Sequence, residues 1–446
     1  MEKEIFVVKR SLVLLAFYIG LSLILGCTTK SIYVNMLNLA GPWDGTETHP
    51  YKTIQDGINA ANSGERVLVM DNAYFENITL KEGVDLEPWK GTPKIAGFSG
   101  SPTILAKGDN AIIGFVIRGG DAGIKVALGG ILSSKDKISV LIQDCEIYET
   151  HRAIEVKTSK DLAFAKNQRK SIYLAIDHNW IRNLTGDGIH VELNGPKTGE
   201  LQISVRIEEN IIQGSFFAGV QLEAIGQGPN PGGFVRALFT GIVGSNLIFG
   251  GKNGIRLHGE NLGSAGVTVF NNTIANNIAH GITASADPGP DGMGSAQSDV
   301  INNIISGNQG YGYQEFTSFT SAVEMSNNLF FQNTKGHYAD NETGNIINTQ
   351  AGLNQPIINN KVVFYSGFGN LVGNPQFATG EFPWMGKINK DGPHIFFLKQ
   401  TGTQKSPAID RGKGLAKDAR LSARTTRTDF SFDTGIVDIG FHYKKF

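Results

Sequence analysis

A short pattern recurs along the chain: a small residue, then alternating apolar and polar side chains, as in Gly254-Ile255-Arg256-Leu257-His258. Alternation with a period of two is typical of a strand with one buried face. Another apolar residue precedes each apolar anchor by seven or eight positions, and successive copies lie 26 to 36 residues apart. A constant segment inside a looser period predicts a solenoid. The paired anchors are Ile117 and Ile124, Ile147 and Ile154, Ile181 and Ile189, Ile212 and Val220, Ile248 and Ile255, Ile274 and Ile282, and Ile305 and Tyr313.

Asparagine recurs at one turn of the repeat, directly after a run of alternating apolar residues. Asparagine tolerates left-handed backbone and can hydrogen-bond to its copies along a stack. We therefore expect a ladder of these side chains within eight to ten coils between about residues 100 and 335. Its members are Asn179, Asn210, Asn246, Asn272, Asn303 and Asn328.

The segment before the coils predicts a helix over 51–64, because Thr53 and Asp56 form a capping box and Ile54, Ile58 and Ala61 share one face. An apolar strand, Val67–Met70, follows. The first coil of a solenoid leaves its core and backbone groups open, so a helix at this position is expected to cover that end.

These opening segments resemble the start of secreted right-handed parallel β-helix proteins of the pectin lyase-like superfamily, and the asparagine column resembles their ladder. The resemblance implies an all-β chain with a single right-handed parallel β-helix over 46–339 and an N-terminal helical cap. Residues 340–446 resemble the C-terminal segment that follows bacterial β-helices, and we interpret them as the last coil and a cap. A separate binding module is the alternative for this segment.

The N-terminus carries Lys9 and Arg10 before an apolar run that is short for a membrane span and ends at Cys27. Its end resembles a bacterial lipobox, which implies a signal peptide over 1–26, lipidation of Cys27, a tether over 27–45, and an anchor in the outer membrane or at the cell surface. The alternative is a plain signal peptide or membrane anchor with an incidental cysteine. Cys145 is expected to be a small buried side chain.

The formal net charge of −1 gives no electrostatic reason to expect a nucleic-acid partner, and we expect a monomer. The outward positions of the recurring strand are the natural binding face. Longer insertions at 157–170, 194–200, 224–236 and 286–297 follow that strand and are expected to form a wall beside it. The face and wall resemble the sugar-binding cleft of pectate lyases and polygalacturonases, which implies a polysaccharide partner along residues 155–285.

The face offers groups for acid–base chemistry. We take Arg256, His258, Glu223 and Glu192 as catalytic candidates, and His190, Lys252, Gln221 and Glu155 as substrate-binding candidates. Glu192 and Glu223 are expected one strand apart, so that one pKa rises or a cation such as Ca²⁺ bridges them. Arg256 or Lys252 could neutralise a uronate, and a histidine could move a proton. This hypothesis makes the chain a lyase or hydrolase.

The same columns also fit a ladder of ion pairs on neighbouring coils, with Lys157 as an additional member. Its pairs are Glu155 with His190, Lys157 with Glu192, and Glu223 with His258. The paired-aspartate motif of polygalacturonases is absent, and Arg256-Leu257-His258-Gly259 resembles the Arg-His-Gly of alginate and chondroitin lyases with a leucine inserted. A non-catalytic surface rod or adhesin therefore stays open beside the enzyme.

Overall fold

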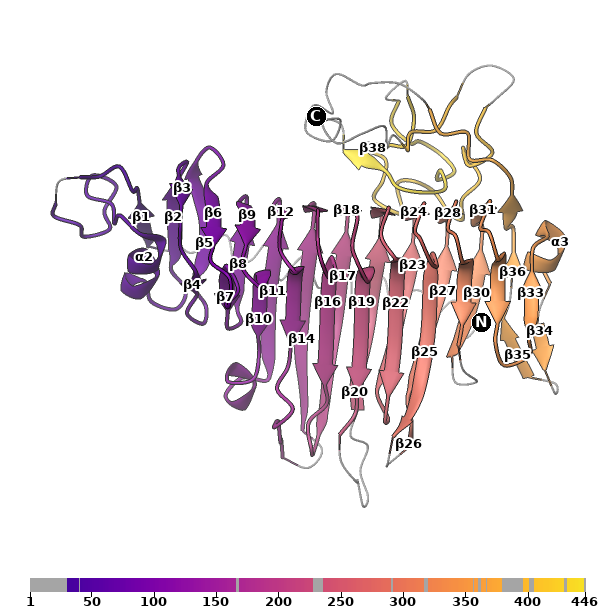
Figure 1. Cartoon of the computed structure of the whole chain (residues 1–446), viewed down its shortest axis with the longest axis horizontal. Coiled ribbons are helices and arrows are strands. Elements are labelled where there is room, and N and C mark those ends of the chain that lie inside the picture. The colour runs from indigo at the N-terminus through magenta and orange to yellow at the C-terminus, as the bar shows by residue number, and fades with distance from the viewer. Residues whose placement is uncertain are drawn as a thin grey trace.

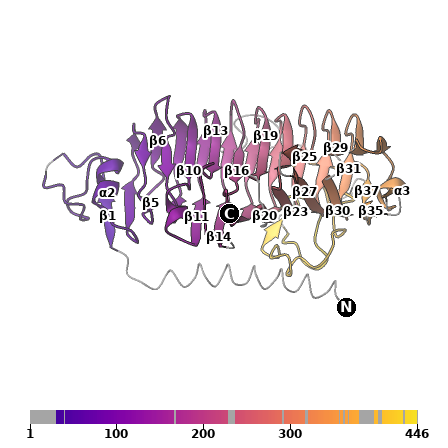
Figure 2. The same ribbon diagram turned by 90° about the horizontal axis from the view of Figure 1, so that it is seen from below.

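The computed structural model describes residues 30–39, 41–165, 168–227, 236–289, 292–316, 320–355, 357–359, 362–365, 367–378, 396–400, 405–428 and 431–444. Within them, the chain winds as a right-handed parallel β-helix whose three long sheets run the length of the molecule (Figure 1). The strands of sheets A and C form opposite sides of the coil (Figure 2). The solenoid predicted from the repeat, and the right-handed parallel β-helix that the resemblance implies, are therefore confirmed.

Sheet A consists of β1 (Ser31–Val34), β2 (Arg66–Met70), β5 (Asp85–Lys90), β8 (Asn110–Ile113), β11 (Lys137–Gln143), β14 (Arg169–Asp177), β17 (Glu200–Glu208), β20 (Arg236–Gly244), β23 (Ser264–Phe270), β27 (Ser295–Ile301), β30 (Thr320–Ser326) and β36 (Gly367–Phe368). Sheet B consists of β3 (Ala73–Tyr74), β6 (Lys94–Gly97), β9 (Val116–Gly119), β12 (Glu146–Tyr148), β15 (Trp180–Arg182), β18 (Ile211–Gln213), β21 (Leu247–Phe249), β24 (Thr273–Ala275), β28 (Ile304–Ser306), β31 (Leu329–Phe331) and β37 (Leu371–Val372).

Sheet C consists of β4 (Ile78–Thr79), β7 (Ile104–Ala106), β10 (Ala122–Ala127), β13 (Arg152–Lys157), β16 (Ile189–Asn194), β19 (Ala218–Ile225), β22 (Asn253–Glu260), β25 (Ile282–Gly289), β26 (Gly292–Met293), β29 (Tyr311–Glu315), β32 (Gly336–Asp340) and β33 (Asn345–Ile347). The remaining elements are α2 (Ile54–Ala60), η2 (Ile131–Ser133), α3 (Gln350–Leu353), and the hairpins of β34 (Ile357–Asn359) with β35 (Val362–Tyr365) and β38 (Arg424–Thr425) with β39 (Tyr443–Lys444).

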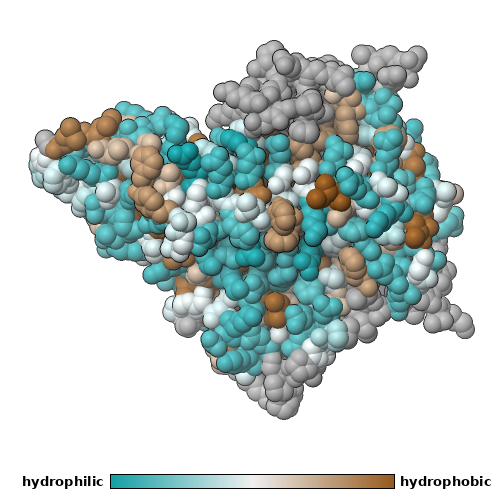
Figure 3. Space-filling view, in the orientation of Figure 1, coloured by the Kyte–Doolittle hydropathy of each residue, from teal (hydrophilic) through white to brown (hydrophobic). Residues whose placement is uncertain are grey.

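The apolar anchors stack as the repeat predicts. In sheet C they are paired in register from strand to strand, and all of them are buried. This column is Ile124, Ile154, Ile189, Val220, Ile255 and Ile282. The preceding anchors form a second column in sheet B. The alternating side chains face outward, where hydrophobic residues are scattered among hydrophilic ones on the face that Figure 3 shows.

The asparagine ladder is confirmed at the turn between sheets A and B. Each buried side-chain oxygen accepts from the backbone and side-chain amides of the preceding asparagine, as Asn246 Oδ1 does from Asn210 at 3.0 Å. The ladder runs from Asn179 to Asn370, one rung beyond the expected column. A second ladder, at the turn between sheets B and C, joins Asn277, Asn308 and Asn333.

The first coil is covered as expected, by α2. Thr53 caps this helix, and its Oγ1 accepts from the Asp56 backbone amide at 3.1 Å. The carboxylate of Glu76 accepts from the Ile54 and Gln55 amides, which satisfies two more free groups of the first turn. The helix ends at Ala60 rather than Gly64, and β1 already pairs with β2 inside the segment interpreted as a tether. Between residues 100 and 335, sheet B has eight strands, which agrees with the eight to ten coils expected there. Its other three strands, β3, β6 and β37, lie outside that range.

The C-terminal segment differs from a simple end cap. Strands β36 and β37 do supply the last coil, and α3 buries Leu353 against the end of the core. The described residues 396–400, 405–428 and 431–444 instead lie along the flank of sheet B, above β18 to β31 in Figure 1. There Phe397 and Tyr443 pack on Leu247 and Phe249. The C-terminal segment packs here because β21 and β24 of sheet B carry outward apolar side chains, such as Leu247, Phe249 and Ala275.

Cys145 is buried and unbridged, and burial raises the pKa of its thiol to about 12. It is therefore the inert core side chain that the sequence predicts. Cys27, the signal peptide, and positions 28, 29 and 40 of the expected tether lie outside the described residues. Among the helices of the described part, none combines the length and apolarity of a membrane span.

Candidate functional site

The candidate residues lie on one surface, the outward face of sheet C from β13 to β25. Register places Glu155 beside His190, His190 beside Gln221, and Gln221 beside Arg256. A parallel column two positions further along joins Lys157, Glu192, Glu223 and His258. Both columns are as the sequence predicts. Their side chains shield one another, so that Glu155, His190, Gln221 and His258 are all less than a tenth exposed.

Ion pairs dominate the N-terminal part of this face. Glu155 lies 2.7 Å from Lys125 Nζ and 2.5 Å from Arg152 Nη1, so it does not pair with His190 as expected. Lys157 Nζ lies 2.7 Å from Glu192 Oε2, which confirms that pair. The difference arises because Arg152, three residues before Glu155, reaches back along the same strand. The carboxylates of β13 and β16 therefore already have cationic partners.

His190 is held between two carboxylates. Its Nε2 lies 3.2 Å from Glu223 Oε2, and its Nδ1 lies 3.3 Å from Asp187 Oδ2 without the alignment of a hydrogen bond. Glu223 also accepts from Gln221 Nε2 at 2.5 Å. The expected pair of Glu223 with His258 is therefore wrong, because the imidazole of His190 reaches the carboxylate from the preceding strand.

For the pair of Glu192 and Glu223, the expected rise of a carboxylate pKa is not seen at Glu223. Burial alone would raise the pKa of Glu223, but the hydrogen bond from His190 and the charges of His190, Arg256 and His258 lower it to about 2. Burial alone would lower the pKa of His190, but Asp187 and Glu223 raise it to about 9. A protonated imidazole beside an ionised carboxylate is the stable state at neutral pH.

Metal binding was the other expectation for this pair. One ligand atom from each of His190, Glu192 and Glu223 lies within 4.8 Å of the others. Ca²⁺ takes six to eight oxygen ligands. Here the positive charges of His190 and Lys157 already lie against the two carboxylates, so this arrangement does not fit Ca²⁺. In a second acidic group, Arg427 likewise contacts Asp410 and Asp438.

The C-terminal part of the face is different in character. Arg256 is half-buried on β22, between Gln221 and Thr283, and within the described residues its guanidinium has no ion pair. His258 Nδ1 lies 2.9 Å from Ser285 Oγ, and its Nε2 is 3.9 Å from Glu260 and 3.8 Å from Asp287. Arg256 is thus a fixed cation that remains available to a ligand, as its column neighbours predict.

Aromatic rings border this part of the face, and the sequence reasoning missed them. Phe217 precedes β19 and carries Lys252 Nζ 5.8 Å from its ring centre. His280 stacks on Tyr311 with ring centres 5.7 Å apart, and Phe316 meets the same imidazole edge-on at 6.2 Å. The Tyr311 amide donates to His280 Nδ1. Burial and the charge of Lys335 lower the pKa of His280 to about 4, so its ring is neutral.

The expected wall is seen in part. Leu162 and Phe164 are buried, and Phe164 N donates to the Thr198 carbonyl, so the insertions at 157–170 and 194–200 pack together. Thr158 and Asn194 exchange hydrogen bonds at the base of this wall. Most of the insertion at 224–236 lies outside the described residues.

No family model matches the chain, and no curated protein matches it. Among solved structures it is similar to a lacto-N-biosidase from Eubacterium ramulus, with 11% identity, 77% of this chain and 67% of that chain covered, and a TM-score of 0.45. It is also similar to a mannuronan C-5 epimerase A-module from Azotobacter vinelandii, with 15% identity, coverages of 72% and 95%, and a TM-score of 0.31. A third similar structure is a family 28 exopolygalacturonase from Yersinia enterocolitica. Its identity is 9%, 78% of each chain is covered, and the TM-score is 0.29.

These similarities are distant, so we classify the chain from its own structure. Three parallel sheets, a stacked apolar core and an asparagine ladder define it as a single right-handed parallel β-helix protein. Its candidate site is a rigid polar face whose first strands are ion-paired and whose later strands are edged by aromatic rings.

Proposed function

We propose that the chain binds polysaccharide along the outward face of sheet C, from β13 to β29. The observation that carries this proposal is that Arg256 lies on β22 without an ion pair among the described residues, while aromatic rings lie at the ends of neighbouring strands of the same sheet. These rings are Phe217, His280, Tyr311 and Phe316. Sugars present hydroxyl and acid groups at their edges and C–H bonds on their faces. Fixed polar groups beside partly exposed aromatic rings suit both surfaces.

The β-helix supports this role physically. Arg256 lies on a strand that is hydrogen-bonded on both sides, by β19 and β25. A ligand group that meets it therefore costs little backbone ordering, which favours affinity. The face also repeats once per coil, as an extended polymer of similar units requires.

Cleavage as a lyase or hydrolase is the stronger form of this proposal. In it, Arg256 would neutralise an acid group on the sugar, and His258 would transfer a proton. His190 and Glu223 would support the face as an ion pair, since their mutual contact already uses the groups needed for acid–base work.

A non-catalytic surface rod or adhesin is the second candidate. The observation that favours it is the pairing of Glu155 with Lys125 and of Glu192 with Lys157, which leaves those carboxylates committed to structure. We also propose that the chain is exported and anchored by a lipid at Cys27.

The test uses the full chain and a panel of neutral and acidic polysaccharides in affinity electrophoresis, followed by assays for new reducing ends and for unsaturated products. We expect retardation by at least one glycan and weaker retardation of Phe316→Ala. The control is Phe432→Ala, because both side chains are 42% exposed and Phe432 lies in the C-terminal segment. Equal retardation of both variants would contradict the site. Binding without products would support the rod over the enzyme.

A further inference from the structure

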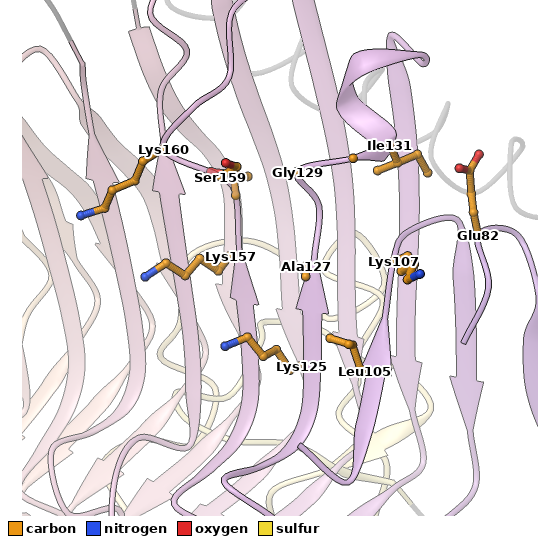
Figure 4. A pocket seen from close by; sticks show the side chains of 12 residues that line it. Glu82, Leu105, Lys107, Lys125, Ala127, Gly129, Ile131, Lys157, Ser159 and Lys160 are labelled. Atoms are coloured by element: carbon orange, nitrogen blue, oxygen red, sulfur yellow. The ribbon is translucent and has the colours of Figure 1, made fainter. Parts of the chain in front are cut away.

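A cavity of about 760 Å³ opens on the same face, at its N-terminal end. Strands β7, β10 and β13 supply its floor, and the turns after β10 and β13 supply its rim (Figure 4). Leu105, Ala127 and Ile131 make part of the lining apolar. The volume lies within the range of about 300–1,000 Å³ that is typical of small-ligand sites.

Four lysines line this cavity, and they fall into two kinds. Lys125 and Lys157 are bound to carboxylates of the next coil, each at 2.7 Å. Lys107 and Lys160 are exposed, and neither has an ion pair within the described part of the chain. The single acidic side chain of the lining, Glu82, is bound to Lys135 at 2.7 Å. The cavity therefore keeps two uncommitted positive charges.

A concave surface with uncompensated charge of one sign attracts ligands of the opposite sign. We propose that this cavity binds an anionic sugar chain, whose carboxylate or sulfate groups are contacted by Lys107 at one side of the cavity and by Lys160 at the other (Figure 4). The inference rests on the proposed function, because the cavity continues into the binding face: Lys125 and Lys157 join Glu155 and Glu192. It adds to that function a second cationic site besides Arg256, at the N-terminal end of the face.

The apolar part of the lining is consistent with a sugar rather than a free ion. An inorganic anion would be held by the ammonium groups alone. A sugar residue would in addition place its C–H bonds against Leu105, Ala127 and the side-chain stems of the lysines.

The test compares matched ligands on the full chain by isothermal titration calorimetry. Oligogalacturonate is set against its methyl ester, and dextran sulfate against dextran. We expect an anionic ligand to bind about tenfold tighter than its neutral counterpart, an advantage that shrinks as salt is added. The pair that shows the larger advantage distinguishes a carboxylate from a sulfate.

The variant is the double substitution Lys107→Gln and Lys160→Gln, which should remove most of the advantage of the anionic ligand. Lys125 and Lys157 are left intact because each stabilises a buried carboxylate. The control is Lys405→Gln with Lys417→Gln, which removes the same charge from exposed positions in the C-terminal segment.

Three results would overturn the inference, and they differ in what they leave standing. Unchanged affinity of the lysine variant for the anionic ligands would remove the anionic subsite while the acid contact of Arg256 survived. Equal affinity for the charged and neutral members of both pairs would remove the subsite and the acid contact of Arg256, and would leave only the binding of uncharged sugar groups. If no glycan bound to the wild-type chain at all, the proposed function and the subsite would fall together.

Discussion

His190 Nε2 lies 3.2 Å from Glu223 Oε2, across the neighbouring strands β16 and β19 of sheet C. Asp187 lies on the other side of the same imidazole. Asp187 and Glu223 raise the pKa of His190, and His190 lowers the pKa of Glu223, so these three side chains belong to the structural framework of the face. The consequences can be measured as stability against pH.

The pKa of His190 is raised from 6.5 to about 9, so its contribution to stability is complete below pH 6.5 and is lost as pH rises to 9. The pKa of Glu223 is lowered from 4.5 to about 2, so its contribution is complete above pH 4.5 and is lost as pH falls to 2. The pair should therefore stabilise the chain most between pH 4.5 and 6.5.

Glu223→Gln should lower stability by roughly 1.5–3 kcal/mol in that window, the range for a hydrogen bond to a charged group. The difference from wild type should shrink towards pH 9 and pH 2. Urea unfolding at a series of pH values measures it, and the exposed Glu47→Gln is the control. A difference that stayed constant with pH would argue against the ion pair.

Arg256→Ala should weaken the binding of an acidic glycan by roughly 1–3 kcal/mol, because a charged hydrogen bond to the ligand is lost. Stability should change by no more than about 0.5 kcal/mol, since no ion pair of the described residues depends on this side chain. Calorimetric titration and thermal unfolding check the two effects. Arg118→Ala, at an exposed position of sheet B, is the control. Normal binding with lowered stability would make Arg256 a structural residue.

Asn246→Ala should destabilise the coil more than an exposed substitution. Its Oδ1 accepts from Asn210, and its Nδ2 donates to the Ile207 carbonyl at 2.8 Å, so removal leaves buried groups unsatisfied. Each such group costs roughly 1–3 kcal/mol. The urea midpoint of Asn246→Ala should fall well below that of the exposed control Asn345→Ala. Similar midpoints would mean that water replaces the lost rung.

Phe397→Ala should release the C-terminal segment from sheet B before the coils unfold. Phe397 is fully buried, and its ring centre lies 3.9 Å from that of Tyr443. Truncating a buried phenylalanine costs roughly 3–5 kcal/mol. Limited proteolysis should then remove residues after 396 while a product that retains the coils persists. Loss of the whole chain at one rate would show that segment and coils form one cooperative unit.

Cys27→Ala should abolish incorporation of a labelled fatty acid in metabolic labelling, because the lipidated thiol is removed. The matched control is Cys145→Ala, which should keep the label because that thiol is buried and inert. Equal labelling of Cys27→Ala and wild type would refute the lipid anchor.

The sequence by itself determined the coil. Apolar anchors such as Ile154, Ile189 and Val220 recur at a spacing that fits one turn, and each buried anchor fixes the face of its neighbours through the strand period of two. The same period set which outward residues stand in one column, including Gln221, Arg256 and Thr283. The asparagine ladder could also be predicted from the sequence, because asparagine recurs at the same turn of each coil and can hydrogen-bond to its copies along the stack.

Only the tertiary structure decided which neighbours pair. Glu223 stands in register with both Glu192 and His258, yet it binds His190 diagonally, because Asp187 and Glu223 together enclose that imidazole. The direction of a side chain depends on all the surrounding charges, so the order of residues in a column does not predict which neighbour it contacts. The C-terminal segment also took its position on sheet B from contacts with Leu247 and Phe249, which are far away in sequence. The lysine cavity needed the folded turns, because Lys107 and Lys160 follow different strands and line one cavity only when three coils are stacked.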